Sequence, residues 1–200
     1  MSKYNYHQTR FLKSEPNITY KNINSGIEVA FLGYSNSGKS SALNFLTNQK
    51  KLSRTSKVPG CTKLVNFFEV FKGFYLLDFP GYGYVKYSYL INSNFKNVVF
   101  RYLNTSTILQ GIVVFMDIRH PMKKIDQEVI KLAFLNKIQV LILLTKSDKI
   151  SFSLQKKVLI QIKHIIFQDY NNTITVELFS IFNKDSVKKL SNMLDLWSKN

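Results

Sequence analysis

An eight-residue segment, GYSNSGKS, constrains the fold of this chain more than any other part of its sequence. It spans 33–40 and matches the pattern G-x-x-x-x-G-K-S/T, with the apolar run IEVAFL directly before it. Residues 39–47 carry a pattern typical of a helix. Glycine lets a backbone wrap closely around an anion, and the amides of such a loop and of a helix N-terminus point toward that anion. The sequence therefore predicts a strand, a phosphate-binding loop and a helix, as at the start of an α/β fold.

Every residue of this loop is a candidate ligand for nucleotide phosphates. Lys39 would reach the β- and γ-phosphates, and the hydroxyl group of Ser40 would bind Mg²⁺. The candidate set is Gly33, Tyr34, Ser35, Asn36, Ser37, Gly38, Lys39 and Ser40.

Apolar runs alternate with helical patterns along the rest of the chain. These runs predict six strands, at 27–32, 63–71, 74–78, 111–117, 138–145 and 173–179. Apolar residues recur at helical spacing within 95–103, 125–133, 154–166 and 187–197. Strands that are apolar on both faces and alternate with helices indicate a mostly parallel sheet with helices on both faces. We expect 25–200 to form a single nucleotide-binding domain and 1–24 to be a short N-terminal extension.

A second motif stands at the end of the strand predicted at 74–78, where ligands of such sheets bind. It consists of Asp78, Phe79, Pro80 and Gly81. Asp78 would hold Mg²⁺ through a water molecule, and the Gly81 amide would contact the γ-phosphate. Asp-x-Pro-Gly by itself is a common turn. Its position after the phosphate-binding loop favours the functional interpretation.

A third motif closes the strand predicted at 138–145 and matches the pattern N/T-K-x-D. It consists of Thr145, Lys146, Ser147 and Asp148. Guanine carries hydrogen-bond donors at N1 and N2, and one ionised carboxylate can accept both. Adenine has no donor at N1, so Asp148 would select GTP over ATP. The aliphatic stem of Lys146 would lie over the purine ring.

Two weaker candidate segments complete the predicted site. The sequence PGCT at 59–62 lies where a switch loop carries a Mg²⁺-binding threonine, although a simple turn before a strand is the alternative. The candidates there are Gly60, Cys61, Thr62, Lys63 and Leu64. Backbone amides at the end of the last predicted strand could meet the guanine oxygen. These residues are Phe179, Ser180 and Ile181.

The formal net charge of +16 favours polyanionic partners such as RNA. Mutational bias toward A/T-rich codons is an alternative source of the many lysines. A run of tyrosines near Lys86 could stack on RNA bases or pack on the following helix. The run comprises Tyr82, Tyr84, Tyr87 and Tyr89. One cysteine cannot form an internal disulfide, the polar N-terminus is unlike a signal peptide, and no apolar run could span a bilayer. We therefore expect a cytoplasmic protein without stable membrane association.

Five sequence strings together resemble one known family. GYSNSGKS, PGCT, DFPGYGY, TKSD and DIRHP, the last at 117–121, are similar to those of the EngB-type ribosome-biogenesis GTPases. DFPGYGY and DIRHP are the most specific, because generic GTPases lack both. The resemblance covers about 26–197 and implies a translation-factor-like sheet whose second strand is antiparallel to the rest. It implies GTP and GDP binding, with Mg²⁺ held by Ser40 and Thr62.

The same resemblance implies a role in assembling the large ribosomal subunit of bacteria, through contact with ribosomal RNA, and in normal cell division and septation. We expect a monomer. This sequence departs from the family at two positions: Cys61 replaces a basic residue, and Ile181 replaces a common serine.

Catalysis in this family would rest on positioning and charge neutralisation by Lys39, Thr62, Gly81 and Mg²⁺. Tyr82 follows Gly81 where a water-orienting glutamine would stand, so we expect intrinsic hydrolysis at about 10⁻⁴ to 10⁻² per second. Related GTPases with asparagine at the position of Asn36 bind K⁺ beside the phosphates. We weigh this role equally against that of a plain turn residue.

Alternative functions are weaker. Arg119 and His120 could be catalytic groups, but a His-Pro step before a helix favours a structural turn. An ATP-using kinase or ATPase could carry the same phosphate loop, and Asp148 argues against it. A nucleotide-gated, non-catalytic scaffold in cell division is a further alternative, which multiple-turnover phosphate release would exclude.

Overall fold

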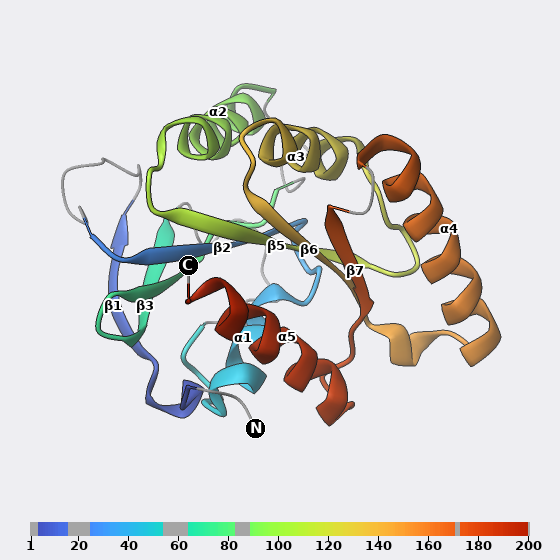
Figure 1. Cartoon of the computed structure of the whole chain (residues 1–200), viewed down its shortest axis with the longest axis horizontal. Coiled ribbons are helices and arrows are strands. Elements are labelled where there is room, and N and C mark those ends of the chain that lie inside the picture. The colour runs from blue at the N-terminus through green and yellow to red at the C-terminus, as the bar shows by residue number, and fades with distance from the viewer. Residues whose placement is uncertain (1–3, 16–24, 54–63, 83–88, 171–172, 200) are drawn as a thin grey trace.

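The computed structural model describes residues 4–15, 25–53, 64–82, 89–170 and 173–199 (Figure 1). The strands are β1 (Arg10–Glu15), β2 (Ile27–Gly33), β3 (Val65–Phe71), β4 (Phe74–Asp78), β5 (Leu109–Asp117), β6 (Gln139–Thr145) and β7 (Ile174–Leu178). The α-helices are α1 (Lys39–Thr47), α2 (Tyr89–Thr105), α3 (Lys124–Leu135), α4 (Phe152–Tyr170) and α5 (Lys184–Trp197). Short 3-10 helices are η1 (Tyr6–Gln8) and η2 (Ser147–Lys149).

Within the described residues, seven strands form one sheet in the order β1-β3-β4-β2-β5-β6-β7. β3 is antiparallel to both of its neighbours, whereas the pairs from β4 to β7 are parallel. The mostly parallel α/β class is confirmed, but the predicted count of six strands is wrong. The additional strand is β1, which pairs with β3 and sets Arg10 opposite Glu69. It lies at an edge and is exposed or half-buried along its length, so no apolar alternation marks it in the sequence.

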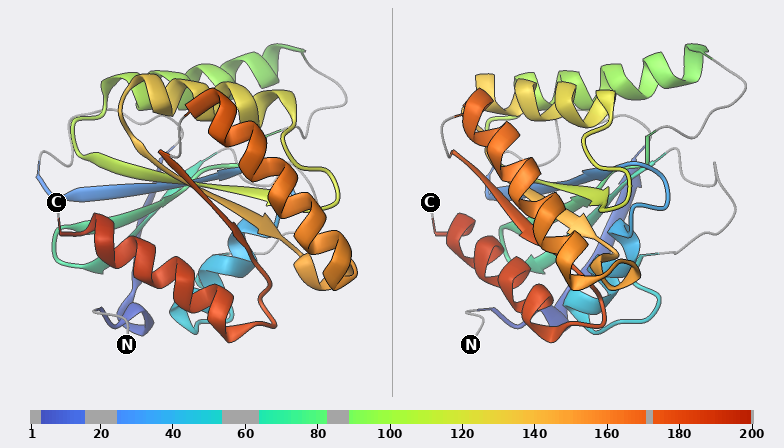
Figure 2. Two further views of the ribbon diagram at one scale, coloured as in Figure 1. Left: turned by 45° about the vertical axis from the view of Figure 1, so that its right-hand side comes forward. Right: turned by 90° about the vertical axis from the view of Figure 1, so that its right-hand side faces the viewer.

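Alternation of side chains along the central strands builds an apolar core on each face of the sheet. In β5, Ile112 and Val114 pack with residues of α2, α3 and α4, whereas Val113 and Phe115 pack with residues of α1 and α5. Figures 1 and 2 show α2 and α3 on one face and α1 and α5 on the other. Because both faces are covered, the central strands are apolar throughout, as their sequences predict.

Gly111 in β5 lies against α5 at a point of close approach. A Cβ atom at this position would lie 2.6 Å from the ring of Trp197, which is 3% exposed. A side chain would therefore push the helix away from the strand, so the packing of α5 requires glycine here.

The N-terminal segment is tied to the domain on the side of α1 and α5. Tyr6 is buried, and its hydroxyl group donates to Asp195 Oδ1 at 2.8 Å. The Gln49 side-chain amide donates to the carbonyl oxygens of His7 and Thr9 at 3.1 and 2.7 Å. These contacts hold the segment that leads into β1.

The carboxyl ends of β2, β4, β6 and β7 meet at one edge of the sheet because these strands run parallel. The predicted motifs follow these four strand ends, which brings residues distant in sequence to a common edge. Among the described residues, no helix is long and apolar enough to cross a membrane.

Candidate nucleotide-binding site

The loop at 33–40 joins the end of β2 to the first turn of α1. Asn36 and Gly38 adopt left-handed conformations, with φ of 62° and 94°. A Cβ on Gly33 would lie 2.5 Å from a backbone carbonyl oxygen of β5. Within the described residues, the buried hydroxyl oxygen of Ser37 has no hydrogen-bond partner. Because an unpaired buried hydroxyl is unfavourable, this group is suited to a phosphate oxygen.

The segment after β4 is docked against this loop through its backbone. The Tyr82 amide donates to the Gly33 carbonyl at 3.2 Å, and the Ser35 amide donates to the Tyr82 carbonyl at 2.9 Å. A Cβ on Gly81 would lie 2.7 Å from the Cα and N atoms of Ser35. Gly81, the candidate γ-phosphate ligand, is therefore held against the loop in a position that only glycine fits.

Asp78 is buried at the end of β4 and binds two side chains. Lys39 Nζ forms an ion pair with Oδ1, and the Ser53 hydroxyl donates to Oδ2 at 3.0 Å. Asn44 holds the backbone of Ser53 with two hydrogen bonds, at 2.9 and 2.8 Å. Hydroxyl and carboxylate oxygens such as those of Ser40 and Asp78 are ligands that suit Mg²⁺. The donor types at this strand end therefore fit that ion.

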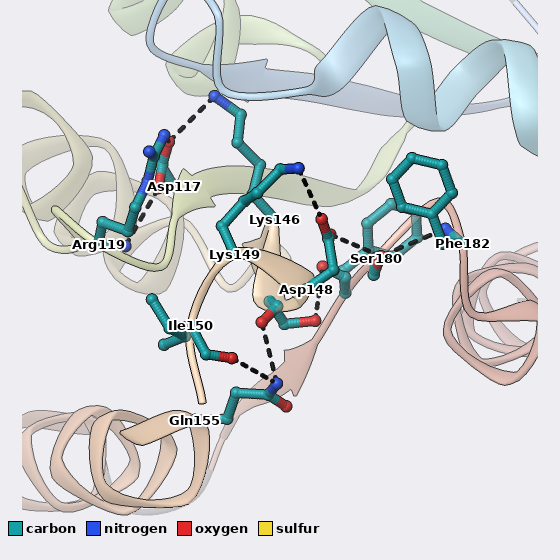
Figure 3. Close-up of polar contacts among 11 residues, drawn as sticks. Asp117, Arg119, Lys146, Asp148, Lys149, Ile150, Gln155, Ser180 and Phe182 are labelled. Atoms are coloured by element: carbon teal, nitrogen blue, oxygen red, sulfur yellow. Dashed lines mark hydrogen bonds and ion pairs between the residues drawn. The ribbon is translucent and has the colours of Figure 1, made fainter. Parts of the chain in front are cut away.

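The predicted guanine motif lies beside the same loop. The Thr145 hydroxyl donates to the Ser37 carbonyl at 2.6 Å, which ties β6 to the phosphate loop. Asp148 Oδ1 accepts a hydrogen bond from the Ser180 hydroxyl at 2.7 Å (Figure 3). The amide and hydroxyl of Ser147 both donate to the Phe179 carbonyl at 3.2 Å. These contacts place the two predicted guanine-binding segments side by side.

Lys146 has a left-handed backbone, with φ of 55°, and its ammonium group lies 3.0 Å from Asp117 Oδ2. Arg119 binds the same carboxylate through Nε at 2.9 Å and Nη2 at 2.6 Å. Hydrogen bonds from Arg119, and then from Lys146, hold the pKa of Asp117 well below its usual range, against the opposing effect of burial. The His120 amide donates to the Asp117 carbonyl at 2.9 Å, which closes the turn that the His-Pro step predicts.

Known proteins are similar in sequence to this chain over nearly its full length. Residues 28–146 match the family described as "50S ribosome-binding GTPase". A "Probable GTP-binding protein EngB" from Buchnera aphidicola subsp. Baizongia pistaciae is 49% identical over 193 residues, which are 96% of this chain and 84% of that protein. This chain belongs to the EngB family of GTPases. A relative of the same name from Salmonella newport is 47% identical over 197 residues, covering 98% of this chain and 93% of that protein.

The fold of the chain agrees with this membership. The crystal structure of a "probable GTP-binding protein engB" is similar, with a TM-score of 0.67 at 20% identity over 86% of this chain and 98% of that one. As an EngB-family protein, the chain is a P-loop GTPase that binds guanine nucleotides and hydrolyses GTP.

The predicted ligands of this EngB-family site fall into two groups. The structure brings together 33–40, 78–81, 145–148 and 179–181 at one edge of the sheet. Leu64 lies just before β3. Gly60, Cys61, Thr62 and Lys63 lie outside the described residues, and their roles stay predictions.

The structure decides between the two alternatives for one tyrosine of the run. Tyr82 is 2% exposed, so of the two alternatives predicted for the run it does not stack on RNA bases, and it packs inside the protein instead. Its ring packs in the core against Tyr34, and its hydroxyl donates to Asp126 Oδ1 in α3 at 2.5 Å. Tyr84 and Tyr87 lie outside the described residues, as does the side chain of Tyr89.

Two acidic residues beside the site carry no signal of their own in the sequence. Asp126 falls within a helical pattern, and only the fold brings it to Tyr82. Asp117 belongs to the DIRHP string, which pointed to the family but gave no role for the aspartate. The register of β5 on β6 explains its place, because Asp117 pairs with Thr145.

Proposed function

We propose that this EngB-family protein is a slow, Mg²⁺-dependent GTPase switch in the assembly of the large ribosomal subunit. The description of its family as ribosome-binding and its net charge of +16 support a ribosomal RNA partner. The role would be exercised in the bacterial cytoplasm, by a monomer without stable membrane association. Through ribosome assembly it would be needed for normal cell division and septation.

One observation carries the switch proposal, namely the docking of the segment after β4 on the phosphate loop. Gly81 is held against Ser35, and Tyr82 is bonded both to the loop and to Asp126 of α3. A contact between the Gly81 amide and a γ-phosphate would therefore be transmitted through Tyr82 to α3. Loss of that contact on hydrolysis gives the two states that a switch requires.

Metal binding would use one residue in the first turn of α1, one at the end of β4, and a threonine that lies outside the described residues. Ser40 and Thr62 would bind Mg²⁺ directly, and Asp78 would do so through water. When bound, Mg²⁺ supplies charge neutralisation to the β- and γ-phosphates. Lys39 would exchange its contact with Asp78 for the phosphates, which would free the carboxylate.

Hydrolysis would be slow because no residue in the described segment after Gly81 can orient water. Tyr82 stands there, and its side chain is buried against α3. Asn36 is exposed in the loop, with a left-handed backbone. Either of its two roles, K⁺ ligand or turn residue, fits this position. Turnover measured in K⁺ and in Na⁺ distinguishes them, because a turn residue predicts equal rates.

Co-sedimentation with purified large ribosomal subunits tests the ribosomal role. Binding of the protein to the subunits would be measured in the presence of a non-hydrolysable GTP analogue, in the presence of GDP and without nucleotide. Each condition would be tested at two salt concentrations. We expect the protein to pellet mainly in the presence of the analogue, and we expect this binding to persist at the higher salt concentration. Equal binding in all three states that vanishes with salt would show only non-specific attraction of a basic protein, and would favour a division role away from the ribosome.

A further inference from the structure

Asp117 lies beside the guanine motif without belonging to it (Figure 3). It pairs with Thr145 across β5 and β6, and the next amide, that of Ile118, donates to the Thr145 carbonyl at 3.0 Å. Lys146 follows Thr145, so the sheet itself sets this lysine within reach of the aspartate. Its ammonium group lies 3.0 Å from Asp117 Oδ2.

The Asp117 carboxylate is itself fixed in place. The tight turn at 117–120 folds Arg119 back onto it, and Arg119 donates from its backbone amide at 3.1 Å and from Nε at 2.9 Å to Oδ1. Nη2 of the same arginine donates to Oδ2 at 2.6 Å. The two-point contact of a guanidinium with a carboxylate fixes orientation as well as distance.

We propose that Asp117, held by Arg119, is a positioning residue that keeps the aliphatic stem of Lys146 in place against the purine ring. The proposal rests on the assignment of TKSD to guanine binding. A lysine side chain has four rotatable carbons and loses much conformational freedom when it is immobilised. Anchoring its ammonium group before the nucleotide arrives removes part of that loss from the binding step.

The two aspartates near the base would then act on different parts of it. Asp148 would read the N1 and N2 donors of guanine, and it is held separately by the Ser180 hydroxyl. Lys146 would contact the ring face, which every purine has. Loss of Asp117 should therefore weaken guanosine and inosine diphosphates alike, because inosine lacks only the N2 amino group. Loss of Asp148 should instead reduce the preference for guanosine.

The test is a set of equilibrium affinities for GDP and IDP, measured by displacement of a fluorescent GDP analogue. The variants are Asp117→Asn, Lys146→Ala, their combination, and Asp148→Asn. Glu69→Gln is the matched control. It removes another arginine–carboxylate pair, with Arg10 at 2.6 Å, on strands away from the site.

We expect Asp117→Asn to weaken both diphosphates by about tenfold, as for loss of one charge-assisted hydrogen bond. The IDP-to-GDP ratio should stay within about twofold of wild type, and Glu69→Gln should bind normally. In the Lys146→Ala background, Asp117→Asn should have no further effect, because Asp117 acts through that lysine. Asp117→Glu keeps the charge and should recover part of the affinity.

Several outcomes would overturn the proposal. If Asp117→Asn binds GDP and IDP as tightly as Glu69→Gln does, the contact between Asp117 and Lys146 does not support nucleotide binding. An undiminished loss in the Lys146→Ala background would show that Asp117 acts by a general effect on the fold. An unaltered preference in Asp148→Asn would instead refute the guanine assignment on which the proposal rests.

Discussion

Asp126 gives a direct test of how the segment after β4 is held. The residue is 1% exposed, with Oδ1 accepting from the Tyr82 hydroxyl and Oδ2 accepting from the Lys123 amide at 3.2 Å. Burial raises the pKa of Asp126 to about 6, and the hydrogen bond from Tyr82 only partly offsets this effect. The neighbouring Tyr34 and Tyr82 have pKa values raised by burial, so both stay neutral in the acidic range.

A carboxyl group with a raised pKa binds its proton more tightly in the folded protein than in the unfolded chain. Its contribution to stability is therefore fully present below the ordinary pKa, near 3.9, and is lost as the pH rises through about 6. Each unit of difference between the pKa of Asp126 in the folded protein and in the unfolded chain corresponds to about 1.4 kcal/mol. The stability lost at neutral pH therefore approaches about 3 kcal/mol. Most of it falls between about pH 4 and pH 6.

Asp126→Asn removes this ionisation while keeping the shape of the side chain. The asparagine carbonyl can accept from the Lys123 amide, and its amide can donate to the Tyr82 oxygen. Unfolding in urea would be followed for both proteins from pH 4 to pH 7. We expect the free energy of unfolding of Asp126→Asn, relative to wild type, to rise by about 2 kcal/mol across this range and then to level off.

Tyr82→Phe is the companion variant and should act in the opposite sense. Without the tyrosine hydroxyl, the ionised carboxylate loses a hydrogen bond, so the pKa of Asp126 should rise further. The free energy of unfolding of this variant should fall below that of wild type increasingly as the pH rises. A pH-independent difference for both variants would refute the burial of an ionisable Asp126 against Tyr82.

Three further predictions concern the phosphate loop and the N-terminus. Gly81→Ala should abolish most of the preference for a GTP analogue over GDP in equilibrium titrations, because its Cβ would press on the Ser35 backbone at 2.7 Å. Single-turnover assays of the isolated protein should give hydrolysis well below one per second, and a rate near that value would contradict the expectation drawn from Tyr82, which stands where a water-orienting glutamine would follow Gly81. Tyr6→Phe should lower the free energy of unfolding by about 1 kcal/mol, since it removes a buried hydrogen bond to Asp195. GDP affinity should not change in Tyr6→Phe.

Much of the sheet and of the candidate site could be predicted because its signals are local. Runs such as VLILL at 140–144 are apolar because helices cover both faces of the strand. The loop at 33–40 has its glycines where the structure adopts unusual φ angles or leaves no space for a Cβ. These conformational requirements concern residues that are close together in the chain, so a short sequence pattern is enough to predict them.

The features that could not be predicted from the sequence depend on contacts between residues that are distant in the chain. β1 joins the sheet by pairing with β3, and an exposed edge strand needs no apolar alternation. Tyr82 sits in a segment that looks like an exposed loop, and its burial depends on an acceptor in α3. No periodicity in the sequence can report such a partner, because each residue alone is compatible with solvent.

The contacts also divide the candidate site into two parts. One part is fixed within the sheet, and the other links the phosphate loop to α3. Thr145 bonds to Ser37, so the base-binding strand end and the phosphate loop are tied directly to each other within the sheet edge. The segment at 78–82 is held instead from both sides, by backbone bonds to the loop and by the Tyr82 hydroxyl on α3. Loss of the γ-phosphate would therefore leave base binding largely intact, while it would alter the contact of Tyr82 with α3. In the proposed switch, this division would let the protein keep GDP bound after hydrolysis and still change the surface that its partner meets.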